Sequence, residues 1–139
     1  MQAINDLQSL NERKRALVNI PARIAELEVQ TTRIRSATAD GTPVSGGGSG
    51  QEDMLLNNIV ERQQLEEDLV LVRKAVKRIT GALDSLTPKE RRLLQVRYID
   101  SEPGAVSKLA GEYNLDERTV RNKLSEAVRL FSIAMCGRS

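Results

Sequence analysis

Residues 105–131 read AVSKLAGEYNLDERTVRNKLSEAVRLF, the stretch of this 139-residue sequence in which helix boundaries are marked most clearly. Apolar residues recur every three or four positions, which predicts a short helix over about 105–113 and a longer one over about 117–135. Asn114 stands between them and tolerates a left-handed backbone better than most residues. Asp116 is a suitable N-cap for the second helix. The pattern predicts a helix-turn-helix.

The packing of these two helices determines which side chains face outward. The small Ala110 lets the helices approach closely, and Leu115 and Val120 fill the angle between them. The early exposed positions of the second helix would then face a DNA major groove. We expect base contacts from Glu117, Arg118, Arg121 and Asn122, and phosphate contacts from Lys108, Lys123 and Arg129. Two readings of Glu117 stay open, an acceptor for cytosine or an aid to helix initiation. Two alternatives to DNA binding stay open: a three-helix bundle with a solvated charged face, and a helix-turn-helix that serves protein contacts instead.

A third helix precedes this pair. Thr87, Pro88 and Glu90 predict a capped start, with proline at the first helical position and a reciprocal capping box. The helix should run to Tyr98 or Ile99, bury Leu93, Leu94 and Tyr98, and end at the break 100–104. Residues 86–139 are therefore predicted to form a three-helix helix-turn-helix domain.

Residues 1–85 carry two amphipathic helical patterns. The first, over residues 2–36, is interrupted by Lys14 and by Pro21, and a break with Asn19 as cap is favoured over a kink. The second runs from Gln51 to about Leu83 and is interrupted by Arg62. The apolar stripes comprise Ile4, Leu7, Leu10, Leu17, Ile20, Ile24, Leu27 and Ile34, then Leu55, Ile59, Leu65, Leu69, Val72, Val76, Ile79 and Leu83.

A flexible Gly/Ser loop, natural or engineered, is expected over residues 37–50 between the two patterns. The predicted fold is all-α: a long, coiled-coil-like helical hairpin followed by the helix-turn-helix domain. A compact bundle, with both arms folded back on the C-terminal domain, is the alternative. One amphipathic arm cannot bury its stripe alone, so the two arms are expected to pair as an antiparallel hairpin. This hairpin is expected to pair again with a second copy, as a homo-oligomer through the N-terminal helices.

Composition narrows the function. The chain has no histidine, a single cysteine and 2% aromatic residues, which argues against a zinc site, an internal disulfide framework and a histidine-based triad. We expect no enzyme activity, no cofactor and no metal. Without a secretory signal or a long apolar run, a soluble, cytoplasmic protein with no membrane partner is expected. Residues 1–85 hold 11 basic and 12 acidic side chains and residues 86–139 hold 10 and 7, so the basic excess lies in the C-terminal part.

Three segments carry a resemblance to a known family. Residues 86–99, then Leu109-Ala110, and finally Thr119 to Ala127 resemble region 4 of sigma-70-type factors, which binds the promoter −35 element. The whole architecture is similar to phage-encoded sigma-like regulators of the ArpU/RinA type. The resemblance implies activation of late genes in phages of Gram-positive bacteria, with DNA contacts at Arg118, Arg121, Asn122 and Lys123.

The sequence departs from the family in two places. Pro103-Gly104 stands where Ser or Thr more often begins the second helix, and Asn114 replaces the usual turn glycine. The aromatic residues with which complete sigma factors melt the −10 element are missing. We therefore expect a phage transcription activator that binds promoter DNA and contacts host RNA polymerase. A small terminase-like DNA-packaging subunit and a helical protein-interaction module are the alternatives, and the sequence does not separate activator from repressor.

Overall fold

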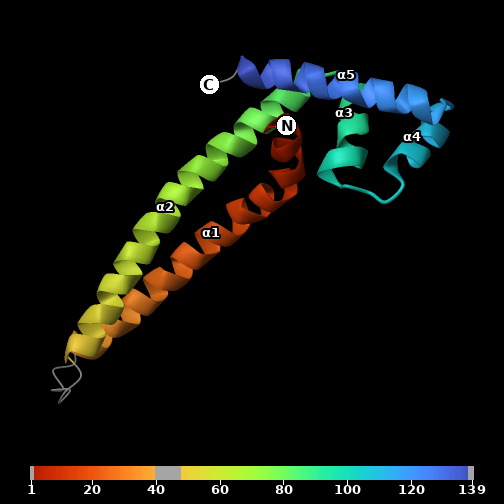
Figure 1. Ribbon diagram of the computed structural model, residues 1–139. Coiled ribbons are helices and arrows are strands. Elements are labelled where there is room, and N and C mark those ends of the chain that lie inside the picture. Colours follow the sequence, from red (N-terminus) through yellow and green to blue (C-terminus); the bar gives the residue numbers. More distant parts are fainter. Residues whose placement is uncertain (1, 40–47, 138–139) are drawn as a thin grey trace. The chain divides into compact units, whose positions relative to one another are not determined.

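The computed structural model describes the backbone of residues 2–39 and 48–137 and the side chains of residues 2–36 and 50–137. The described chain is helical, with no strand, which confirms the all-α prediction (Figure 1). The helices are α1 (Gln2–Ala39), α2 (Gly48–Asp84), α3 (Pro88–Leu94), η1 (Gln95–Ile99), α4 (Ala105–Tyr113) and α5 (Glu117–Cys136). None of the described helices is both long and apolar enough to cross a membrane.

The chain divides into two compact units, and the division does not follow the sequence boundary at residues 85/86. Unit 1 contains residues 1–14 and 74–139, and unit 2 contains residues 15–73. The start of α1 and the end of α2 therefore belong with α3, η1, α4 and α5, while the rest of the hairpin forms a unit of its own.

Unit 1 encloses two clusters of buried side chains. The larger one joins residues from α1, α2, α3, η1 and α5, with Leu7, Leu94 and Phe131 fully buried. The smaller one lies among α3, η1, α4 and α5, with Val96, Leu109 and Val120 fully buried. Leu93 and Leu94 are buried as predicted, but Tyr98 is only half-buried, because η1 points Val96 and Ile99 inward instead.

The segment η1 is π-helical, which the sequence pattern did not predict. The backbone N–H of Asp100 donates to the carbonyl of Gln95 over 2.8 Å, a bond that spans five residues. The next turn reaches a left-handed conformation at Ser101 and again at Gly104, where φ is 65°. Despite the Pro103-Gly104 departure, α4 begins at Ala105 as the sequence predicts.

Unit 2 is an antiparallel pair of helices, the parts of α1 and α2 within residues 15–73 (Figure 1). Two ion pairs join the helices: Arg23 Nε lies 3.1 Å from Glu61 Oε1, and Arg62 Nη2 lies 2.9 Å from Glu28 Oε1. Arg62, which interrupts the apolar stripe of α2, thus forms ion pairs with Glu28 and Glu66. The predicted stripe is wrong at Ile59, which is 40% exposed; the neighbouring Asn58 is the half-buried residue.

The favoured break at Pro21 is wrong, since α1 is one helix with Pro21 inside it and Asn19 is not a cap. Proline removes one backbone hydrogen bond within the helix. Packing against α2 compensates for that loss: Leu27 is fully buried two turns later and Arg23 pairs with Glu61.

The predicted loop 37–50 is also shorter than expected, because α1 continues to Ala39 and α2 begins at Gly48. Its remainder, residues 40–47, lies outside the described residues.

Candidate nucleic-acid interface

The turn between α4 and α5 sets the angle between these two helices of unit 1. Asn114 ends α4 with φ 53° and ψ 48°, the left-handed conformation that the sequence predicts there. The backbone N–H of Leu115 then donates to the carbonyl of Ala110 over 2.9 Å. Leu109 and Val120 are fully buried on the two sides of the turn, with Leu115 half-buried beside them. These contacts fix the two helices in a helix-turn-helix arrangement.

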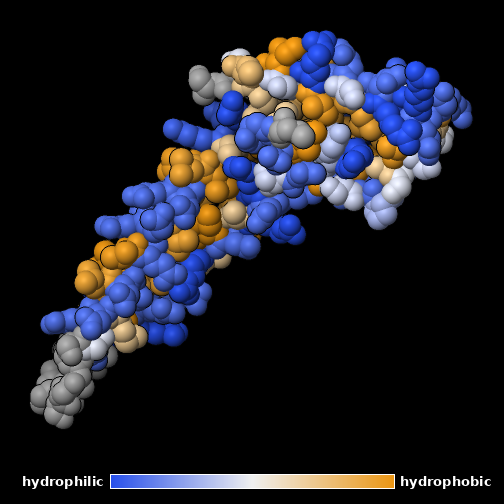
Figure 2. All heavy atoms as spheres, in the orientation of Figure 1, coloured by the Kyte–Doolittle hydropathy of each residue, from blue (hydrophilic) through white to orange (hydrophobic). Residues whose placement is uncertain are grey.

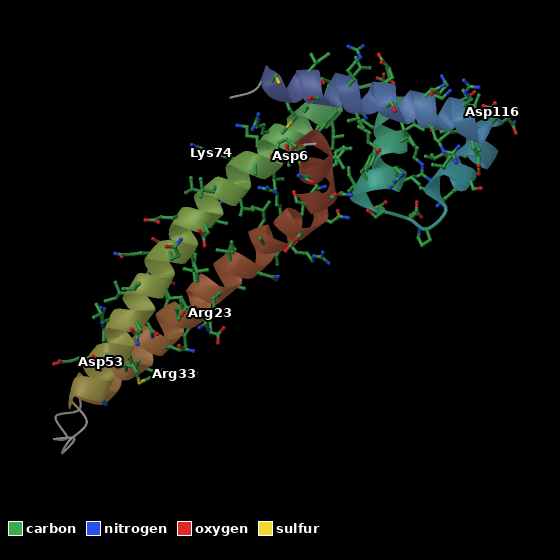
Figure 3. All side chains as sticks on the ribbon, in the orientation of Figure 1. Asp6, Arg23, Arg33, Asp53, Lys74 and Asp116 are labelled. Atoms are coloured by element: carbon green, nitrogen blue, oxygen red, sulfur yellow. The ribbon has the colours of Figure 1, made fainter. Side chains whose placement is uncertain are left out.

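The first turn of α5 is capped as predicted. Asp116 accepts a hydrogen bond from the backbone N–H of Thr119 over 2.8 Å, and Figure 3 shows Asp116 at that end of the helix. Hydrogen bonds from Thr119, side chain first and then backbone, lower the pKa of the Asp116 carboxyl below its usual value. A charged cap also interacts favourably with the positive end of the helix.

Periodicity along α5 separates its buried and outward sides. Val120, Leu124, Ala127 and Phe131 are buried. Arg118, Asn122 and Arg129 lie on the opposite, exposed side, four and then seven residues apart. Arg121 and Lys123 are exposed on its two flanks. Polar side chains accordingly project from the open side of the helix (Figure 3).

Some of the predicted site residues already form ion pairs with carboxylates of the same chain, and others do not. Lys108 Nζ lies 2.8 Å from Glu102 Oε1, and Arg121 Nη2 lies 3.6 Å from Glu117 Oε2. Arg129 is paired with Glu126 through two nitrogen atoms, at 2.6 and 3.0 Å. This pairing lowers the pKa of Glu126 and raises that of Arg129. Because the side chains of all three pairs are largely exposed, these ion pairs contribute little to the stability of the fold.

Three of the predicted residues are free to meet a ligand. Arg118, Asn122 and Lys123 are exposed and form no side-chain hydrogen bond or ion pair with another described residue. Glu117 accepts a hydrogen bond from the Ser107 hydroxyl over 2.8 Å, which ties the start of α5 to α4. This contact favours the reading of Glu117 as a residue that helps α5 to begin, since its carboxylate is already engaged within the protein.

Sequence reasoning missed a second set of residues beside α4. A shallow hollow there is lined by Arg97, Glu102, Ser107 and Glu117, together with residues 104–106. The N-terminus of α4 opens there with no side-chain cap, because Gly104 precedes it. The signal in the sequence was the Pro103-Gly104 pair, which provides no capping side chain.

Two contacts hold α4 against α3. Arg92 forms a two-nitrogen ion pair with Glu112, at 3.1 and 3.3 Å, and the bond from Arg92 lowers the pKa of Glu112. Lys89 Nζ lies 4.8 Å from the centre of the Tyr113 ring. Burial of Tyr113 raises the pKa of its hydroxyl. Neither contact had been predicted, because each joins residues at least 20 positions apart.

Charge over this surface is balanced. Residues 102–129 contain five basic and five acidic side chains. The local net charge is therefore zero, and the cations on α5 that have no ion-pair partner among the described residues are Arg118 and Lys123. Among the described residues, no group of three or more His, Cys, Asp or Glu side chains could hold a metal ion.

Comparison of the chain with protein-family models, with curated proteins and with solved structures finds no match.

Proposed function

We propose that this protein is a non-enzymatic, sequence-specific DNA-binding regulator of transcription. The observation that carries the proposal is the outward face of α5, the second helix of the helix-turn-helix. On this face Arg118 and Asn122 are exposed and have no side-chain partner among the described residues. In such motifs the first turns of the second helix enter the major groove. Arginine recognises guanine, and asparagine recognises adenine, through paired hydrogen bonds.

The remaining cations are assigned to the DNA backbone. Lys123 is available, whereas Lys108 and Arg129 would exchange their carboxylate partners, Glu102 and Glu126, for phosphate oxygens. Such an exchange is inexpensive, since exposed ion pairs contribute little to stability. Arg121 is placed to join Arg118 and Asn122 in base recognition after leaving Glu117.

The resemblance of residues 86–127 to sigma region 4 supports the same assignment and extends it to the biological setting. In this proposal the protein is a phage activator that acts in the cytoplasm of the bacterial host. It binds promoter DNA, contacts host RNA polymerase and forms a homo-oligomer through its N-terminal helices.

The proposal is tested by fluorescence anisotropy with double-stranded DNA fragments, including those that flank the gene for this protein, at two salt concentrations. We expect one fragment to be preferred and affinity to fall with salt. Arg118→Ala and Asn122→Ala should each cost about 1–3 kcal/mol of binding on the preferred fragment only. Lys123→Ala should weaken binding to every fragment equally.

The matched control is Arg73→Ala, which removes an exposed arginine in unit 2. It should leave the fragment preference unchanged. Binding that is absent, or that is equal for all fragments and insensitive to Arg118 and Asn122, would contradict base recognition by α5.

A further inference from the structure

Unit 1 carries the net positive charge of the chain. Residues 1–14 and 74–139 hold 15 basic and 10 acidic side chains, whereas residues 15–73 hold 6 basic and 9 acidic ones. Around α4 and α5, however, residues 102–129 are balanced, with five of each. The positive excess of unit 1 therefore lies outside the candidate interface.

Three basic residues of unit 1 lie together near the end of α2. Lys74, Lys77 and Arg78 stand close together in the sequence, and no acidic residue occurs between Asp68 and Asp84. All three side chains are exposed. We call these three residues the α2 cations. Figure 2 shows hydrophilic side chains projecting from this part of α2.

The α2 cations have no carboxylate partner among the described residues. Lys74 and Lys77 form no hydrogen bond or ion pair with a described residue. Arg78 Nη2 donates a hydrogen bond to the backbone carbonyl of Met135 over 3.2 Å. Most N–H donors of the guanidinium remain available, because a single one is used in this bond. The positive charge at this end of α2 is thus not neutralised within the described chain.

The two lysines lie on the open side of α2. Val76 and Ile79 pack in the larger buried cluster of unit 1. Lys74 is two residues from Val76, which places it on the opposite side of the helix, and Figure 3 shows it on the side of α2 away from α1. Lys77 follows three residues after Lys74 and is its neighbour on the helix surface. One ligand can therefore contact both ammonium groups.

The composition of this surface favours phosphate as the ligand. Among residues 74–84, no large apolar side chain is highly exposed. The centre of a protein–protein interface is apolar and depleted in lysine. Lysine and arginine are instead the residues that bind the DNA backbone, and these contacts supply much of the affinity. Cations without exposed apolar neighbours are therefore better suited to a phosphodiester chain than to a protein.

The α2 cations are also close enough to α5 to reach the same DNA duplex. Arg78 contacts Met135 near the end of α5, whereas Arg118 and Asn122 lie near its start. The helix between Asn122 and Met135 is about 20 Å long at about 1.5 Å per residue. One turn of DNA is about 34 Å long. Both groups of residues therefore fit within one turn of a duplex.

We infer that the α2 cations form a second DNA contact, which binds the phosphodiester backbone beside the bases assigned to α5. The inference rests on the proposed function and extends its DNA-binding surface to α2. Backbone contacts of this kind add affinity without sequence preference. They complement an interface on α4 and α5 that has no net charge of its own.

The test is the salt dependence of DNA binding by the full chain, measured by fluorescence anisotropy with the preferred fragment and an unrelated one. In Lys74→Gln/Lys77→Gln, the slope of log affinity against log salt should fall by about 1.8, since each phosphate contact contributes about 0.9. Affinity for both fragments should decrease by the same factor. Glutamine has a helix propensity close to that of lysine, so α2 should be preserved.

The matched control is Arg33→Gln/Arg35→Gln, which removes the same charge from exposed positions of unit 2. It should leave the slope unchanged. An equal loss of slope in both double variants would mean that net charge, and not the α2 cations, governs the affinity, and would overturn the inference.

A second measurement locates the contact directly. Lys77→Cys in a Cys136→Ser background is labelled with an iron chelate that cleaves nearby DNA by hydroxyl radicals. Cleavage should occur beside the preferred site and within one helical turn of it. The Cys136→Ser protein, which has no thiol, should give no cleavage after the same treatment.

The two proposals fail separately. If the wild type prefers no fragment, the proposed function is wrong and this inference falls with it. If the preference persists but the lysine double variant keeps the wild-type slope, or if the chelate does not cleave, the assignment of α5 stands and that of the α2 cations is wrong. Normal DNA binding with lost binding to RNA polymerase would show that this surface contacts an acidic protein, and would also overturn the inference.

Discussion

Unit 1 and unit 2 are built from the same types of residue but bury them to different extents. In unit 1, residues from six helices enclose two clusters, and side chains such as Phe131, Leu94 and Leu109 are fully buried. In unit 2, two helices share one seam, and Leu27 and Leu69 are the buried apolar residues among those that the structure describes there. Amphipathic periodicity defines a helix face, but a closed core requires helices on several sides.

The largest expected effect tests this contrast directly. Phe131→Ala should lower the free energy of unfolding by about 3–5 kcal/mol, because it removes a fully buried ring from the core of unit 1 and leaves a cavity. Leu71→Ala in unit 2 should change it by less than about 0.5 kcal/mol, since Leu71 is 65% exposed. Urea denaturation followed by circular dichroism measures both, and equal losses would remove the contrast.

A second pair of variants probes the turn between α4 and α5 in unit 1. Asn114→Val should destabilise the protein by about 1–2 kcal/mol, because a β-branched side chain is strained at φ 53°. Asn114→Gly should be tolerated, since glycine adopts this conformation without steric cost. Thermal unfolding of the two variants compares them, and a fully stable valine variant would contradict the left-handed turn.

The third prediction concerns a weakness within unit 2. The amide nitrogen of Asn58 is buried without a hydrogen-bond partner among the described residues. Asn58→Leu should therefore stabilise the protein by about 1 kcal/mol in urea denaturation. Asn57→Leu, at an exposed neighbouring position, is the control and should have little effect. A loss of stability in the Asn58 variant would mean that this amide has a partner.

The smallest effect is a pH dependence at the start of α5. Since the pKa of Asp116 is lowered in the folded protein, its charge stabilises the fold at pH values above its usual pKa of about 3.9, and this contribution is lost as the pH falls through the lowered value. Asp116→Asn keeps the cap but not the charge. The difference in melting temperature between wild type and variant should be constant from pH 7 to about pH 5 and shrink in stronger acid. A difference that grows in acid would contradict the lowered pKa.

Sequence reasoning located most of unit 1. The capping box of Thr87 with Glu90 forms with bonds of 2.9 and 3.2 Å, α4 spans the predicted residues, and both the turn at Asn114 and the cap at Asp116 are present. These features depend on neighbouring residues, so local chemistry is sufficient to predict them. Exposure of the seven site residues on α4 and α5 follows from the same periodicity.

The errors lie where distant residues decide the outcome. Pro21 remains inside α1 because α1 contacts α2 in the residues that follow the proline. At the seam between α1 and α2, Asn58 is half-buried and Ile59 is exposed. The carboxylates that pair with Lys108 and Arg129 were not predicted either, because several partners within reach on the sequence compete for each cation.

The sequence alone determined that this protein is helical, where its helices begin and end in the C-terminal part, and which face of α5 is outward. Apolar periodicity, helix caps and the left-handed backbone of Asn114 decide these features, and each depends on residues only a few positions apart. Only the tertiary structure decided that residues 1–14 and 74–84 belong to the core of unit 1 and that eight apolar side chains of unit 2 stay exposed. Burial depends on how many helices surround a side chain, and that number is a property of packing in three dimensions.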